Sequence, residues 1–198
     1  TGEFYLLQIR PIVDSKQMLD EDLASIPDEK CLLRSHNSLG HGVSTDVTDV
    51  VYIKTSDDFT AADNPAIADE IEHMNRKFLA DNTGYVLVGP GRWGSSDPWL
   101  GVPVKWPHIS AAKIIVETTL KNYSVDPSQG THFFQNLTSF GVGYFTIDEN
   151  KGMGFFRKEI LDAMPSVDET EHVRHVRFDK PLKIMMDGMK QEGLVMEQ

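Results

Sequence analysis

The chain has 198 residues, of which 40% are hydrophobic and 25% are charged, so its composition is that of an ordinary soluble globular protein with room for one or two cores. The formal net charge of -11 disfavours non-specific binding to nucleic acid or to anionic membranes, because the long-range field repels both. The single cysteine, Cys31, excludes an internal disulfide and fits a reducing compartment. Since no apolar run reaches the length of a membrane span and no signal-peptide pattern is present, we expect a cytoplasmic protein.

The opening residues predict a buried strand that ends in two long polar side chains. Residues 4–12 are mostly apolar and are closed by Pro11. Gln8 and Arg10 are two residues apart and point to the same face, where an amide and a guanidinium can converge on one anionic ligand. The alternative is a strand-end arginine that pairs with a surface acid. The polar, acidic residues 14–30 then predict a linker with a short helix.

Residues 31–150 mix strands with single helices, which indicates a layered α/β or α+β domain. The clearest helix starts at Asn64-Pro65, a cap followed by proline, and ends at residues 82–84. A second helix is predicted at 132–140, capped by Thr131 and stopped by Gly141. Strands are predicted at 32–34, 49–53, 85–88, 114–116 and 142–147, and a helical turn at 109–113.

Residues 151–198 predict a small β-rich C-terminal tail. Short apolar runs occur at 154–156, 172–178, 182–186 and 194–196. The pair Asp187-Gly188 is a turn signal between the last two of them.

His132 is the strongest candidate for chemistry. It follows Gly130 and the capping Thr131 at a predicted helix start, where backbone N–H groups and the helix dipole favour a negative group such as a phosphate. A neutral imidazole is nucleophilic near physiological pH and can accept a phosphoryl group and pass it on. The alternative is a histidine that only caps or packs at the helix terminus.

The loop after the strand at 85–88 offers a weaker candidate. Residues 89–94 match Gly-x-Gly-x-x-Gly, but the following residues 95–98 predict more loop rather than the helix that a dinucleotide-binding fold requires. Arg92, with Trp93 and Trp99 nearby, can bind an anion, or it can stack on a tryptophan for structural reasons. The histidine spacings, with no second cysteine, predict no metal site.

Two resemblances go beyond this residue-level analysis. The segment Leu7-Gln8-Ile9-Arg10-Pro11 resembles the closing strand of the ATP-grasp domain in the phosphoenolpyruvate synthase and pyruvate phosphate dikinase family, which implies that Gln8 and Arg10 contact ATP. The stretch from Gly130 and Thr131 through His132 to Gly141-Val142 is similar to the swivelling phosphohistidine domain of that family. This second resemblance implies that His132 carries a phosphoryl group.

The resemblance implies a division into three parts and a role for each. Residues 1–30 would be the last ATP-grasp strand and a linker, 31–150 a swivelling β/β/α-type domain, and 151–198 the β-rich tail. The chain would be a C-terminal fragment of a phosphotransferase, inactive alone, that passes a phosphoryl group between ATP and pyruvate or a related acceptor. ATP and Mg²⁺ would bind in the full-length protein with the upstream ATP-grasp domain, and no nucleic acid or membrane partner is expected.

The competing hypothesis is a noncatalytic binding or interaction module that kept the swivelling fold and lost the histidine chemistry. The bulky Phe133 and Phe134 directly after His132 favour this alternative, since they can close the space that an incoming domain needs.

Overall fold

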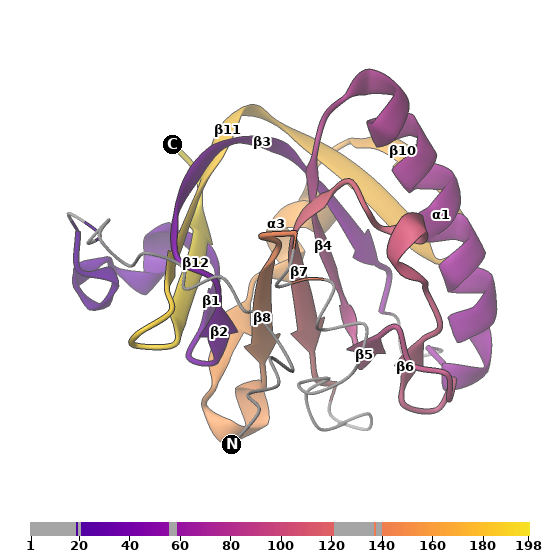
Figure 1. The fold of residues 1–198 in the computed structure, drawn as a ribbon, viewed down its shortest axis with the longest axis horizontal. Coiled ribbons are helices and arrows are strands. Elements are labelled where there is room, and N and C mark those ends of the chain that lie inside the picture. The colour runs from indigo at the N-terminus through magenta and orange to yellow at the C-terminus, as the bar shows by residue number, and fades with distance from the viewer. Residues whose placement is uncertain (1–18, 20, 56–58, 121–136, 138–139) are drawn as a thin grey trace, which may run out of the picture.

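A long curled sheet with one main helix on its outer face forms the body of the protein (Figure 1). The computed structural model describes residues 19, 21–55, 59–120, 137 and 140–198. The expected mixture of strands and helices is confirmed, and the fold is of the α+β type. None of the helices in these ranges is both long and apolar enough to cross a membrane.

Ten strands pair in the order β2-β8-β7-β4-β3-β11-β12-β1-β9, with β10 added beside β11. A separate parallel pair joins β5 to β6. The strands are β1 Cys31–Ser35, β2 Ser38–Leu39, β3 Gly42–Ile53, β4 Tyr85–Pro90, β5 Arg92–Trp93, β6 Gly101–Val102, β7 Ala112–Thr118, β8 Gly143–Ile147, β9 Gly154–Phe156, β10 Ser166–Glu169, β11 Val173–Asp187 and β12 Glu192–Met196. The helices are α1 Asn64–Asp81 and α3 Lys158–Ala163, with short 3₁₀ turns at Leu23–Ser25, Asp28–Lys30, Ala61–Asp63, Trp106–His108 and Glu149–Lys151.

The centre of the sheet is parallel. Strands β3, β4, β7 and β8 run in one direction, whereas all other pairings of this sheet are antiparallel. β4 and β8 are buried along their whole length, as expected for parallel strands that are covered on both faces. The carboxyl ends of these four strands therefore meet at one edge of the sheet, here called the carboxyl edge.

The sheet curls until its two ends approach each other (Figure 1). The Ser35 hydroxyl of β1 donates to the Thr146 carbonyl of β8 at 2.6 Å, and an isolated bridge links Asp148 to Met153 just before β9. One apolar cluster, which includes Val50, Val86 and Val116, fills the inside of the curl. Leu161 of α3 belongs to this cluster and covers one end of it.

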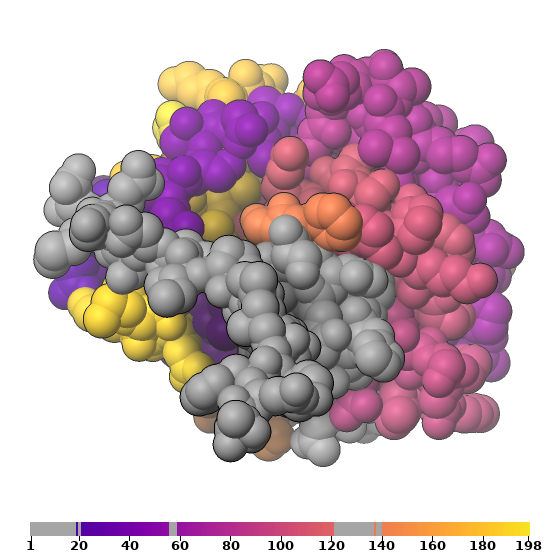
Figure 2. Space-filling model, in the orientation of Figure 1, coloured from indigo at the N-terminus to yellow at the C-terminus, as the bar shows by residue number. Residues whose placement is uncertain are grey.

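Helix α1 packs on the outer face because its apolar residues recur on one side. Ile67, Ile71 and Phe78 are buried against the sheet, and full burial of such a side chain stabilises the fold by roughly 1.5–3 kcal/mol. Asn82 has a φ of 53° and ends the helix in the left-handed conformation, as predicted. In Figure 2, α1 forms one continuous outer surface with the segment that contains β6 and the Trp106–His108 turn.

Asn64 differs from its predicted role as a helix cap. It is the first helical residue, its side chain is fully buried, and its amide donates to the Pro98 carbonyl at 2.6 Å. Asp63 takes the cap position without a side-chain cap bond. The asparagine therefore fastens α1 to the loop before β6.

Three local predictions need correction. The helical turn expected at 109–113 lies earlier, at Trp106–His108, and β7 already begins at Ala112. The runs at 172–178 and 182–186 are one strand, β11, whose pairing register with β3 shifts between Arg177 and Leu182. Residues 158–163 form α3, for which no helix was predicted. The strands of 151–198 pair with β1 and β3 of the preceding segment.

Candidate functional site

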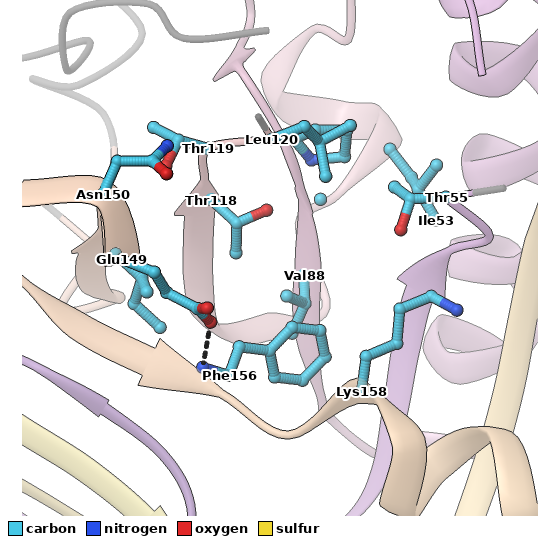
Figure 3. Close-up of a pocket in the computed structure, with 13 residues that line it drawn as sticks. Ile53, Thr55, Val88, Thr118, Thr119, Leu120, Glu149, Asn150, Phe156 and Lys158 are labelled. Atoms are coloured by element: carbon cyan, nitrogen blue, oxygen red, sulfur yellow. Dashed lines mark hydrogen bonds between the residues drawn. The ribbon is translucent and has the colours of Figure 1, made fainter. Parts of the chain in front are cut away.

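A pocket of about 250 Å³ opens at the carboxyl edge (Figure 3). In open sheets with parallel strands, ligands bind outside the carboxyl ends of those strands, because the loops that follow them converge there. All four parallel strands reach this pocket, and β9 and the start of α3 close its remaining side. The polar lining residues are Thr55, Thr118, Thr119, Glu149, Asn150 and Lys158, and the main apolar ones are Ile53, Val88, Leu120, Ile147 and Phe156.

Three neutral polar side chains of the lining have no hydrogen-bond partner among the residues that the structure describes. Figure 3 shows the hydroxyls of Thr55 and Thr118 on opposite sides of the pocket, with the Thr118 hydroxyl pointing into it. Within the described ranges, neither of these hydroxyls nor the Asn150 amide has a side-chain hydrogen bond. Each group can both donate and accept, so the pocket offers unused hydrogen-bonding capacity.

The two charged groups of the lining, in contrast, already have partners. A carboxylate oxygen of Glu149 accepts the Phe156 backbone N–H at 3.0 Å, which is the dashed line in Figure 3. The Lys158 amine donates to Asp162 at 2.7 Å and lies 5.6 Å from the centre of the Tyr52 ring. A ligand that binds Glu149 or Lys158 must therefore compete with partners inside the protein.

Asp162 also fixes Tyr52 beneath the lysine. The Tyr52 hydroxyl donates to Asp162 at 2.8 Å. Burial, together with this hydrogen bond and the negative charge of Asp162, raises the pKa of Tyr52. Tyr52 therefore stays neutral and acts as a donor that helps to hold the Asp162 carboxylate near Lys158.

Asp148 anchors the loop that contributes Glu149 and Asn150. The Thr119 hydroxyl donates to Asp148 at 3.1 Å, and the Lys151 amine lies 3.2 Å from its other oxygen. Loss of hydration opposes ionisation, but the bonds from Lys151 and Thr119 prevail and lower the pKa of Asp148. The loops after β7 and β8 are thus tied together at the rim of the pocket.

On the outer face of the same edge, Glu117 joins β7 to the glycine-containing loop. Its buried carboxylate accepts the Trp93 backbone N–H at 3.1 Å and the Tyr144 hydroxyl. The Trp93 indole N–H donates to the Val116 carbonyl at 3.0 Å. A side chain at Gly101 would come within 1.9 Å of the Arg92 carbonyl oxygen, so the close pairing of β5 with β6 requires glycine there.

Arg92 lies half-buried in β5, in the position where a dinucleotide-binding fold would need a helix. Trp93 next to it is buried, whereas Trp99 is 70% exposed. The strand at Arg92–Trp93 agrees with the expectation that residues 89–94 are not a dinucleotide-binding motif, since no helix begins there. An anion-binding role for Arg92 stays a prediction.

The other predicted site residues, Gln8, Arg10, Thr131 and His132, lie outside the described residues, and their roles stay predictions. The structure does describe the residues that follow His132. Leu137 is helical and buried, Gly141 has a φ of 68°, and the Val142 N–H donates to the Leu137 carbonyl at 3.0 Å. This is the bond pattern of a helix that ends at a left-handed glycine and leads into β8.

Two histidine–carboxylate pairs lie away from the pocket, along β11. A ring nitrogen of His172 lies 2.7 Å from Glu70 of α1, and one of His175 lies 2.6 Å from the buried Asp49 of β3. Arg177 donates to the same Asp49 oxygen at 2.8 Å. In the parts of the chain that the structure describes, no group of three or more histidine, cysteine or acidic side chains is arranged to hold a metal ion.

Cys31, the predicted core thiol, is 1% exposed. Burial raises its pKa, which disfavours the reactive thiolate, although the charge of Arg34 opposes the shift.

Comparison with known proteins adds no further assignment, because no family model, curated protein or solved structure matches this chain.

Proposed function

We propose that this chain is part of an ATP-dependent phosphotransferase resembling phosphoenolpyruvate synthase and pyruvate phosphate dikinase, in which His132 carries the phosphoryl group. One observation supports the proposal most. Between the adjacent parallel strands β7 and β8, the connection that contains His132 ends in a helical Leu137, a left-handed Gly141 and Val142, as the resemblance to the phosphohistidine domain requires. The same connection begins after Thr118 with Thr119 and Leu120, which line the pocket.

In this function the neutral imidazole of His132 attacks a phosphorus atom of ATP. A phosphorus–nitrogen bond forms while the phosphoanhydride bond to the rest of the nucleotide breaks, and the departing nucleotide takes the bonding electrons. The phosphoryl group then moves from His132 to pyruvate or a related acceptor, and the imidazole is regenerated. Gln8 and Arg10 would contact the nucleotide, Mg²⁺ would neutralise part of its charge, and the reducing cytoplasm is the compartment that fits.

In this proposal the Mg²⁺ ion binds together with the nucleotide. Over the described ranges no cluster of acidic or histidine side chains fits Mg²⁺. Coordination of this ion through ATP and through residues of the ATP-grasp domain agrees with the preference of Mg²⁺ for substrate phosphates over an all-protein cage.

Labelling of the full-length protein with ATP that carries ³²P at the β and γ positions tests the proposal. We expect acid-labile label on the protein and its complete loss in His132→Ala. The matched control is His73→Ala, on the exposed side of α1, which should retain the label. Label that persists in His132→Ala would overturn the carrier role.

The second candidate is a noncatalytic binding module. The pocket favours it, because described residues of β3, β4, β7, β8 and β9 bring several polar groups to one space. Absence of label from the unmodified protein, together with retained binding at the carboxyl edge, would select this alternative.

A further inference from the structure

The pocket at the carboxyl edge has a chemical character that the proposed phosphoryl transfer does not use. Its unpartnered polar groups are the hydroxyls of Thr55 and Thr118 and the Asn150 amide, all of them uncharged. Leaving such groups desolvated and unpaired costs roughly 1–3 kcal/mol each, so an apolar ligand is disfavoured. A ligand that fills the pocket must offer its own donors and acceptors on several sides.

An anionic ligand is disfavoured by the charges around the pocket. Lys158 is the cation of the lining and is already paired with Asp162 at 2.7 Å. The Glu149 carboxylate lies in the opposite wall, and Asp148 lies at the rim. Asp148 is itself paired with Lys151, so a carboxylate or phosphate that enters would meet the Glu149 carboxylate and a cation that is already neutralised.

The apolar part of the lining fits the flat, carbon-bound face of a ring. Figure 3 shows the Phe156 side chain and Val88 together at the floor, below the Thr118 hydroxyl. Val88 is buried and belongs to the inner core, and Phe156 packs against it, so this floor is held rigidly. Hydroxyl groups at the margin of such a ring would face Thr55, Thr118 and Asn150 while its C–H groups cover the floor.

We infer that this pocket binds a small uncharged molecule rich in hydroxyl groups, of the size of a monosaccharide or a cyclic polyol. The volume of about 250 Å³ admits such a molecule with some water. Glu149 and Lys158 serve as an additional acceptor and donor for its hydroxyls, because each charged group has hydrogen-bonding capacity beyond its internal partner.

Saturation-transfer NMR on the chain without ATP tests this inference. The probes are myo-inositol, D-glucose and D-ribose, with pyruvate and inorganic phosphate at equal concentration as charged comparators. We expect transfer to the ring protons of at least one polyol, and competition among those that bind, while pyruvate and phosphate give no competition. Since no nucleotide is present, this result is independent of whether His132 carries phosphate.

Two substitutions localise the binding. Thr118→Val keeps the shape of the side chain and removes its hydroxyl, and should weaken polyol binding about fivefold. Thr45→Val, on the exposed part of β3 outside this pocket, is the matched control and should leave the affinity unchanged. The inference is overturned if no polyol binds, if pyruvate or phosphate competes, or if Thr118→Val binds as tightly as the control.

Discussion

The carboxyl-edge pocket and the ion pairs along β11 contain similar residue types but differ in how their polar groups are satisfied. Five residues on or next to β11, here called the β11 network, form two bonded groups: Glu70 with His172, and Asp49 with His175 and Arg177. In the pocket, Thr55, Thr118 and Asn150 have no side-chain partner in the described chain. A polar group that is already paired contributes to the fold, whereas one left open toward a cavity is available to a ligand.

Because their polar groups are already paired, we infer that the two histidine–carboxylate pairs stabilise the fold rather than bind a ligand. His172 next to Glu70 has the residue types of an acid–base pair, but the Thr170 hydroxyl and the His172 backbone N–H also bond to the same carboxylate. His175 and Asp49 are both buried, and the His175 ring lies 5.0 Å from that of Phe78. Neither pair lines the carboxyl-edge pocket.

The largest expected effect comes from breaking the β11 network at its most buried charge. Asp49→Ala removes the carboxylate shared by His175 and Arg177, and should lower the free energy of unfolding by about 3 kcal/mol, because the buried His175 ring loses its hydrogen-bond partner and Arg177 loses its ion pair. Urea unfolding measures the change. Asp179→Ala changes an exposed aspartate in the middle of β11 and should stay within about 0.5 kcal/mol of the unmodified protein. An equal loss of stability in both variants would show that the paired Asp49 carboxylate contributes no more to the fold than an exposed one.

A smaller loss is expected from the Thr170 hydroxyl, which donates to Glu70 of the β11 network. Thr170→Val removes the donor to Glu70 without changing the shape of the side chain, and should cost about 1.5 kcal/mol of stability, the usual range for a bond to a charged group. Thermal unfolding at neutral pH provides the comparison. Unchanged stability would mean that Glu70 does not depend on this bond.

Acid should weaken the Glu70–His172 pair of the β11 network. Hydration lost on burial opposes ionisation of Glu70, but the bonds from His172 and Thr170 lower its pKa in the folded state. The unfolded chain therefore takes up the proton first, and the stability from this group, full above the ordinary value of 4.5, is lost as the pH falls through the lower folded value. Unfolding measured from pH 6 to 3 should show a shallower decline for Glu70→Gln. An equally steep decline in that variant would assign the acid sensitivity to other groups.

The smallest effect on stability is expected inside the pocket. Thr118→Val removes a hydroxyl with no side-chain partner in the described chain, so the free energy of unfolding should change by less than about 0.5 kcal/mol. Thr170→Val is the matched substitution with a bonded hydroxyl. Similar losses in the two threonine variants would show that the Thr118 hydroxyl is used by the fold.

The sequence predicted those helices and strands that are determined by neighbouring residues, such as a cap or a regular apolar spacing. Helix α1 follows from Asn64-Pro65, the apolar spacing and the left-handed Asn82, and β4 and β8 follow from short apolar runs. The sequence predicted two separate runs, 172–178 and 182–186, on either side of a charged segment that contains Pro181. In the structure these residues lie where the pairing with β3 shifts register, a position that tolerates proline within a strand.

The pocket could not be predicted, because its walls come from four strand ends that are far apart in the sequence. Thr55, Pro90, Thr118 and Glu149 become neighbours only once β3, β4, β7 and β8 are known to be parallel. A usable signal was present, since each of these apolar runs is followed at once by polar or turn-forming residues. The proposed carrier His132 rests on motif resemblance and on the helix end at Gly141.

The most direct test of the functional carboxyl edge is residue-resolved amide NMR during titration with myo-inositol. The account predicts shifts confined to the ends of β3, β4, β7 and β8 and to Phe156 and Lys158, with no change at Glu70, His172 or Asp49. Shifts centred on the β11 network, or none at saturating polyol, would contradict it.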